Sequence, residues 1–306
     1  MRLMRATMNS GRAKLRDGHA LPVIAILAVL IVIWYAGAVW LNSQRVIDGY
    51  NDDDDMKGKW TTSDLIRDTL SMNRPVLPAP DQVLMELDRS VLEVAPTSNR
   101  SLLYHAWVTL SAALVGFALG AALGIVLAIA IVHVATLERA LMPWVIASQT
   151  IPILAIAPMI IVVLGSIGFV GLMPKAFISA YLCFFPVTIG MVKGLTSPEP
   201  LQIDLIRTYS ATRAQMFRKL RWPASFAFLF PSLKIAVALA VVGAIVGELP
   251  TGAAAGLGAR LLAGSYYGQT VQIWSALVLA SLVAGLSVAA VGWAERITLR
   301  RMGGRL

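Results

Sequence analysis

The sequence WVTLSAALVGFALGAALGIVLAIAIVHV, residues 107–134, contains no Asp, Glu, Lys or Arg. An α-helix rises about 1.5 Å per residue, and about 20 apolar residues are needed to cross a hydrocarbon core of about 30 Å. The stretch is therefore long enough to span a membrane as one helix. Gly116, Gly120 and Gly124 recur on one face of that helix, which is typical of membrane helices that pack closely against a neighbour.

Similar apolar runs lie on both sides of this stretch. The chain of 306 residues is 57% hydrophobic and 14% charged, whereas soluble domains are about 45–50% apolar and about 25% charged. The sequence therefore predicts an all-α, polytopic membrane helix bundle with six transmembrane helices. We place the spans at residues 22–41, 107–134, 141–164, 170–192, 228–246 and 273–294.

The spans divide the chain into five segments. A cleavable signal peptide is the alternative for the start, because a basic segment and an apolar run precede the small residues Ala36-Gly37-Ala38. Without cleavage, the predicted order is a basic N-terminus (1–21), the first helix (22–41), an outside segment (42–106), a core with five helices and the loop 193–225 (107–296), and a basic tail (297–306).

Charge is distributed unevenly between the two sides of the predicted bundle. The formal net charge is +9, and Lys and Arg cluster in the N-terminus, in the loop 193–225 and in the tail. Residues 42–100 carry seven basic and eleven acidic residues, a net charge of −4. By the positive-inside rule, the basic segments and both termini are cytoplasmic and residues 42–100 lie outside. Topology alone accounts for the basic clusters, so nucleic-acid binding is not expected.

A few ionisable residues lie within or beside the spans, where an ionised group is costly. We expect His105, His133 and Lys175 to reach toward the membrane interface from the ends of their helices. Cys183 is the only cysteine and lies in an apolar run. A single cysteine cannot form an intramolecular disulfide or a cysteine metal site. We expect Cys183 to be a small buried side chain.

The loop between the fourth and fifth spans contains two short predicted helices. The first is expected to begin near Ser197-Pro198-Glu199, with a hydroxyl cap, an early proline and an acid at the positive helix end. Thr212 and Gln215 have the spacing of a capping box for the second.

In this loop Asp204-Leu205-Ile206 is followed by Ser210, Leu220 and Trp222-Pro223. The pattern resembles the EAA motif of ABC importer permeases. The first three residues occupy its Glu-Ala-Ala places, Ser210 the glycine place, Leu220 the hydrophobic place and Trp222-Pro223 the Leu-Pro place. The similarity is to the nitrate, sulfonate and taurine branch and covers most of the chain from Leu77 onward. It includes Leu77-Pro78-Ala79-Pro80, Ile151-Pro152, Ala157-Pro158, Val246-Gly247-Glu248 and Gly256-Leu257-Gly258.

The resemblance implies a type I ABC importer permease in the bacterial inner membrane. In that family the loop is a coupling helix seated in a groove of a separate ATPase, and the permease works with an extracytoplasmic solute-binding protein. We expect two copies of this chain, or a closely related pair, around one pore. The residues expected to couple to the ATPase are Asp204, Leu205, Ile206, Arg207, Tyr209, Ser210, Arg213 and Pro223.

The sequence departs from the motif at two points. Leu205 and Ile206 replace two alanines and enlarge the expected docking face, and Ser210 lacks the easy access of glycine to left-handed backbone.

A polar step and several prolines mark the expected translocation path. Prolines within membrane helices leave backbone carbonyls unpaired, which favours packing against other helices or a watery cavity. An interhelical hydrogen bond is the alternative role for Gln149, and solvation at the outer boundary is the alternative for Glu248. The predicted path residues are Ser148, Gln149, Thr150, Pro152, Pro158 and Glu248.

The chain has no Gly-x-x-x-x-Gly-Lys-Ser/Thr phosphate loop. We therefore expect no enzymatic activity, cofactor or metal in this chain, with ATP and Mg bound by the partner ATPase. An ion-gradient-driven secondary transporter is the alternative, but it would need central acids or unwound ion-binding helices, and the predicted spans contain no central acid. A membrane enzyme would need a catalytic cluster, and no cluster of His, Asp and Glu appears within the spans. The expected solute is small and polar, of the nitrate, sulfonate, taurine or pyrimidine-precursor class, among which the sequence does not choose.

Overall fold

The computed structural model describes residues 20–53, 58–250, 253 and 255–302. The described part of the chain contains helices and no strand. It divides into two compact units, with the boundary between Glu86 and Leu87. Nearly all of the basic N-terminus (1–21), two of the outside acids (Asp54 and Asp55) and the end of the basic tail (303–306) lie outside the described residues.

Five described helices are long and apolar enough to cross a membrane, and a bent pair brings the number to six when it is counted as one span. The predicted polytopic helix bundle is thus confirmed. The five are α1 (Ala20–Asp52), α4 (Leu102–His133), α7 (Leu172–Leu195), α10 (Trp222–Glu248) and α12 (Thr270–Arg301).

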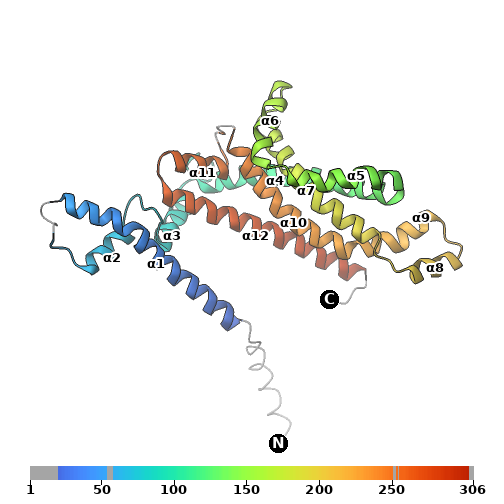
Figure 1. Cartoon of the computed structure of the whole chain (residues 1–306), viewed down its shortest axis with the longest axis horizontal. Coiled ribbons are helices and arrows are strands. Elements are labelled where there is room, and N and C mark those ends of the chain that lie inside the picture. Colours follow the sequence, from blue (N-terminus) through green and yellow to red (C-terminus); the bar gives the residue numbers. More distant parts are fainter. Residues whose placement is uncertain (1–19, 54–57, 251–252, 254, 303–306) are drawn as a thin grey trace, which may run out of the picture. The chain divides into compact units, whose positions relative to one another are not determined.

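The predicted third span, residues 141–164, is not one helix. It is divided between α5 (Ala135–Ala147) and α6 (Ile153–Ser166), which are bent by 103° around a short 3₁₀ turn (Ser148–Thr150). Ile151 is extended (φ −80°, ψ 121°) because the following Pro152 disfavours helical backbone before it and supplies no N–H. Figure 1 shows α6 turning away from α5.

The helix α7 packs between α4 and α10 through small residues. A Cβ atom built on Gly120 of α4 would lie 2.6 Å from the carbonyl oxygen of Ala180, and one on Gly124 would lie 2.7 Å from that of Phe184. On the other side, a Cβ on Gly243 of α10 would lie 2.7 Å from the Cα of Ser179. The backbones approach too closely for side chains, which confirms the predicted glycine face.

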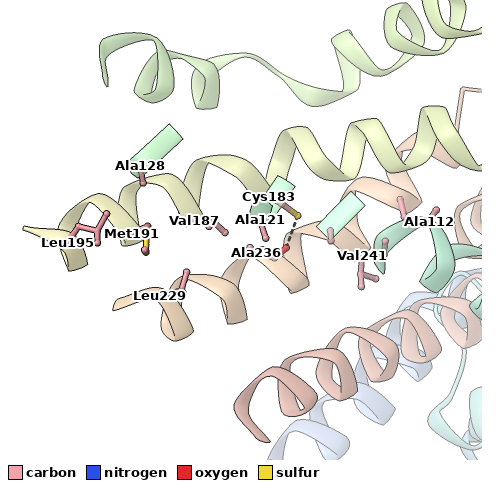
Figure 2. Packing of buried hydrophobic residues seen from close by; sticks show 13 residues of the cluster. Ala112, Ala121, Ala128, Cys183, Val187, Met191, Leu195, Leu229, Ala236 and Val241 are labelled. Atoms are coloured by element: carbon pink, nitrogen blue, oxygen red, sulfur yellow. Dashed lines mark hydrogen bonds between the residues drawn. The ribbon is translucent and has the colours of Figure 1, made fainter. Parts of the chain in front are cut away.

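Figure 2 shows the core where these three helices meet. The thiol of Cys183 is buried and donates a hydrogen bond to the carbonyl of Ala236 on α10, 3.0 Å away. The predicted small buried cysteine is thus confirmed. The labelled neighbours are Ala112, Ala121, Ala128, Val187, Met191, Leu195, Leu229 and Val241.

In the N-terminal unit, α1 continues past the predicted end of the first span at residue 41 and ends at Asp52. Asn42 is fully buried there, accepts a hydrogen bond from Val76 N (2.7 Å) and donates one to Leu77 O (2.9 Å). The next helix, α2 (Thr62–Leu70), is tied to α1 by the hydroxyl of Tyr50, which donates to Asp68. The described parts of this outside segment up to Asp52 and from Thr62 to Leu70 are therefore helical.

The amphipathic helix expected after Pro78 is present as α3 (Pro80–Asp88), followed by a π-helical turn (Arg89–Glu93). Val83 is buried, whereas Leu84 and Leu92 are exposed. The apolar positions are therefore only partly covered within the chain.

Candidate functional site

The loop between α7 and α10 carries α8 (Pro200–Thr208) and α9 (Arg213–Met216) at one end of the bundle, and α11 (Leu257–Tyr266) lies at the opposite end (Figure 1). The predicted hydroxyl cap by Ser197 is wrong, because that hydroxyl donates to Gly194 O (2.7 Å) and closes the preceding helix. Glu199 is the N-cap residue instead. Its backbone N–H donates to Gln202 Oε1, and Pro200 is the first helical residue.

An exposed apolar row, which we call the α8 stripe, is formed by Leu201 and Leu205 of α8 and by Tyr209, the C-cap residue that follows it. Their exposed fractions are 77%, 57% and 80%. Residues four apart lie above one another on a helix, so Leu201 and Leu205 share one face, and Tyr209 follows at the same spacing. Clustered exposed apolar side chains at a projecting helix mark a surface suited to a partner protein.

Asp204 and Arg207 form an ion pair on α8, with Nη1 and Oδ1 3.1 Å apart and both side chains largely exposed. Exposed pairs of this kind contribute about 0–1 kcal/mol to stability. The pair orients two charges beside the α8 stripe and adds little to the fold.

Ser210 ends α8 in left-handed backbone, with φ of +52°, and is the one non-glycine with positive φ in the described ranges. Its N–H donates to Arg207 O (2.9 Å), and the next N–H, of Ala211, points to Ile206 O (3.4 Å). These bonds close the helix end and reverse the chain. The position thus has the conformation that glycine adopts most easily, although serine occupies it.

The second loop helix is continuous with α10. Thr212 Oγ1 accepts from Gln215 N (3.3 Å) and Gln215 Oε1 accepts from Thr212 N (2.8 Å), which confirms the predicted capping box. A π-helical turn (Phe217–Arg221) then leads into α10, with Pro223 in its first turn. Residues 213–248 form one 36-residue helical rod, about 54 Å long at about 1.5 Å per residue.

The structure gathers four of the six predicted path residues at the break between α5 and α6. Ser148, Gln149 and Thr150 form the 3₁₀ turn, and Pro152 follows it. Tyr181 of α7, which the sequence analysis did not single out, donates its hydroxyl to Ser148 O at 2.6 Å.

The other two predicted path residues lie apart from this turn. Pro158 is exposed within α6, and Glu248 is the last residue of α10. The translocation role of all six residues stays a prediction.

Glu248 is at the centre of a buried polar cluster. Its carboxylate is fully buried and accepts hydrogen bonds from Thr109 Oγ1 (3.0 Å to each oxygen) and from Gly258 N (2.8 Å). Lys175 Nζ lies 3.4 Å from the same carboxylate. The alternative of a solvated Glu248 is therefore wrong for this chain.

Lys175 does not reach toward the interface as expected. It is 6% exposed, and its amine also donates to Ala255 O at 3.1 Å. The buried carboxylate of Glu248 supplies the counter-charge that allows the amine to turn inward. Glu248 is 73 positions away in the chain. The residues that neighbour Lys175 in the sequence therefore give no sign of this ion pair.

His105 also belongs to this cluster and was wrongly expected at the interface. Its Nδ1 accepts from Gly256 N and its Nε2 donates to Asn99 O, each at 2.9 Å. These partners assign the neutral tautomer with the proton on Nε2. His133 is exposed and bonds to Ile129 O, as expected for a helix end.

A cavity of about 650 Å³ adjoins the cluster. Most of its lining residues are apolar and three are aromatic, and Lys175 and Ala255 bring the polar cluster to its edge. Its lining includes Tyr104, Trp107, Ser111, Phe169, Lys175 and Ala255.

Comparison with known proteins places this architecture among transport proteins. Residues 120–303, more than half of the chain, match the family described as the binding-protein-dependent transport system inner membrane component. The formylaminopyrimidine transport permease protein ThiX of Halalkalibacterium halodurans is 33% identical over 226 residues, which cover 73% of this chain and 85% of that protein.

Two further relatives are also named as transport permeases. The riboflavin transport system permease protein RibX of Chloroflexus aurantiacus is 34% identical over 66% of this chain and 74% of its own. The putative aliphatic sulfonates transport permease protein SsuC of Bacillus subtilis is 24% identical over 74% of this chain and 78% of its own. With its apolar spans and projecting loop, the chain belongs to the inner-membrane permease family of binding-protein-dependent ABC importers.

Proposed function

We propose that this permease forms the translocation path for a small polar solute and couples to a separate ATPase through α8 and α9. The proposed coupling is supported by the α8 stripe, three exposed apolar side chains on or directly after a capped helix that projects from the bundle. ATP and Mg belong to the partner, since no phosphate loop occurs in this sequence.

The loop meets the mechanical needs of such coupling. Ser210 closes α8 with backbone hydrogen bonds, and Thr212 caps α9, so neither helix depends on the partner for its ends. The continuity of residues 213–248 then gives a displacement at α9 a direct route into the bundle. Rigid-body movement of packed helices is an established way to transmit a change between sites.

Co-purification in mild detergent tests the coupling surface. We expect the tagged chain to retain its ATPase, and the triple variant Leu201→Ala, Leu205→Ala, Tyr209→Ala to lose it. Leu282→Ala with Leu286→Ala is a matched control, because these exposed apolar residues lie on α12. Undiminished association of the triple variant would exclude the α8 stripe as the docking face.

A second copy of the chain completes the proposed pore. The two helices that flank the polar turn at Ser148, α5 and α6, expose large apolar side chains, among them Trp144 (76%), Met159 (67%) and Val162 (70%). Such a surface suits either lipid or another permease. We favour the second copy because polar groups at membrane depth need to border protein or a watery path.

Cross-linking tests this arrangement in the native background, since the one cysteine, Cys183, is fully buried. A Gln149→Cys variant in membranes, treated with a short bifunctional thiol reagent, is expected to give a covalent dimer. Leu286→Cys on α12 is the comparison position. A dimer from Leu286→Cys and none from Gln149→Cys would move the interface away from the broken pair.

The membrane orientation follows from charge. We place the α8–α9 loop and both termini in the cytoplasm of a bacterium, where basic segments are retained. The acidic segment 42–100 then faces an extracytoplasmic solute-binding protein. A protease-protection experiment on sealed inner-membrane vesicles of known orientation checks this placement through a tag at the C-terminus.

For the solute, we favour a planar nitrogen heterocycle over an aliphatic sulfonate. The relatives named for formylaminopyrimidine and riboflavin are 33% and 34% identical, and the one named for sulfonates is 24% identical. The cavity wall contains Tyr104, Trp107 and Phe169, and aromatic rings stack well on flat ligands. Uptake of labelled riboflavin or formylaminopyrimidine by cells with the complete system tests this, and uptake of taurine alone would overturn it.

A further inference from the structure

We infer that Glu248 is a positioning residue that fastens the outer end of α10 to α4, α7 and residues 255–258, so that movement of the α8–α9 loop reaches the cavity wall. The inference rests on the proposed coupling function and adds the element that receives the motion. Glu248 itself is fully buried and need not contact the solute.

The first support is the set of elements that meet at the carboxylate. Thr109 comes from α4, Lys175 from α7 and Gly258 from α11, and all three have polar atoms within 3.4 Å of Glu248. One side chain at the end of α10 thus contacts three other helices. A displacement of that end moves these partners together or breaks buried polar contacts, which is costly.

The second support is that residues 255–258, which lead into α11, are shaped around this carboxylate. Gly256 has φ of +132°, and a Cβ there would overlap the carboxyl group of Glu248. A Cβ on Gly258 would lie 2.9 Å from Glu248 Cβ. The N–H groups of Gly256 and Leu257 are in turn held by His105 and Thr109. The backbone therefore docks directly on α4 and on Glu248.

The third support is the contact between the cluster and the cavity. Lys175 and Ala255 both line the cavity, and the amine of Lys175 joins Ala255 O to the carboxylate of Glu248. A buried ion pair often contributes no net stability compared with apolar residues. Its effect here is placement, because it fixes the cavity wall to the end of α10.

The fourth support is the continuity of the rod. Arg213 and Glu248 are the two ends of one described helical segment. The α8–α9 loop and the cavity wall are therefore joined by a single helix with a polar attachment at its far end.

The test measures movement of the cavity wall and ATP hydrolysis in the same sample of the complete transporter in liposomes. Ala253, which lines the cavity, is replaced by cysteine in the native background, where Cys183 is buried. We expect the rate of labelling by N-ethylmaleimide to change by about fivefold or more when a non-hydrolysable ATP analogue is added, which is a typical coupling between two sites.

In the same background, Glu248→Gln is expected to abolish the nucleotide-dependent change in labelling while ATP hydrolysis continues. Thr109→Val, which keeps the shape of the side chain and removes its hydroxyl, is a milder second variant and is expected to reduce the change. The double variant Lys234→Met with Glu295→Gln is the control, since it neutralises another α10 ion pair that lies outside the cluster. It is expected to keep the change.

If Glu248→Gln and Thr109→Val each lose both the labelling response and ATP hydrolysis, the role of Glu248 is merely structural and the inference is overturned. An unchanged labelling response in Glu248→Gln would also overturn it. Absence of an associated ATPase from the unmodified chain would overturn the proposed coupling function itself, which distinguishes the two failures.

Discussion

The hydroxyl of Tyr181 on α7 donates a hydrogen bond to the main-chain carbonyl of Ser148, 2.6 Å away, in the turn where α5 and α6 diverge. Pro152 cannot donate to that carbonyl four residues back. The tyrosine therefore satisfies a backbone group at the break and fastens the bent pair to the central helix.

Tyr181→Phe is expected to remove this bond and to lower the free energy of unfolding by about 1 kcal/mol, the usual contribution of one hydrogen bond. Thermal unfolding of the purified chain in detergent measures the change. Tyr266→Phe is the control, because Tyr266 is 79% exposed. Equal unfolding temperatures for the Tyr181 variant and the unmodified chain would contradict the anchoring role.

Asp204→Lys is expected to abolish association with the ATPase, because it reverses a charge beside the α8 stripe and places it next to Arg207. The unfolding temperature should change little, since an exposed ion pair contributes about 0–1 kcal/mol. Co-purification and thermal unfolding of the same preparation separate the two effects. Asp204→Asn, which removes the charge without reversing it, should retain more ATPase. Full association of the lysine variant would exclude this carboxylate from docking.

Ser210→Gly is expected to stabilise the end of α8, because a side chain in left-handed backbone costs about 1–2 kcal/mol. The φ of +52° at this residue is the basis for that expectation. Ser210→Val should have the opposite effect, since a β-branched residue fits this backbone poorly. Hydrogen exchange of the α8 amides reports the local change. Faster exchange in the glycine variant would argue against strain at this position.

Gly120→Ala is expected to lower stability by about 1–3 kcal/mol, the usual cost of overpacking a core. Its new Cβ would lie 2.6 Å from the carbonyl oxygen of Ala180, so α4 and α7 must separate. Gly285→Ala is a matched control within α12, because nothing lies within 4 Å of its Cβ position. Thermal unfolding of both variants provides the comparison, and similar effects at the two sites would contradict close α4–α7 packing.

Features that depend on the spacing of residues within one helix could be predicted from the sequence. The apolar spans, the glycine face of α4 and the capping box of Thr212 and Gln215 depend on spacing within one helix. The family resemblance extended that prediction to the loop between α7 and α10. It placed Ser210 where the family has glycine, and the φ of Ser210 is +52°.

The polar cluster could not be predicted in this way. Thr109 and Glu248 are 139 positions apart, and each has an ordinary local explanation in a membrane helix. Only the packing of α4 and α10 on α7 brings them together. The prolines of the third span indicate a break, but the angle of 103° at Pro152 could not be predicted, because it is set by the surrounding helices.

The closure of the α8–α9 loop on itself has an evolutionary consequence. Its helix ends are satisfied by its own backbone and by Thr212, while its outward side chains, Leu201, Leu205 and Tyr209, are exposed. Substitutions on that outward face can accumulate without disturbing the packing of α7 and α10. Under the proposed function, the surface that recognises the ATPase can therefore change in sequence without a change in the residues that line the cavity.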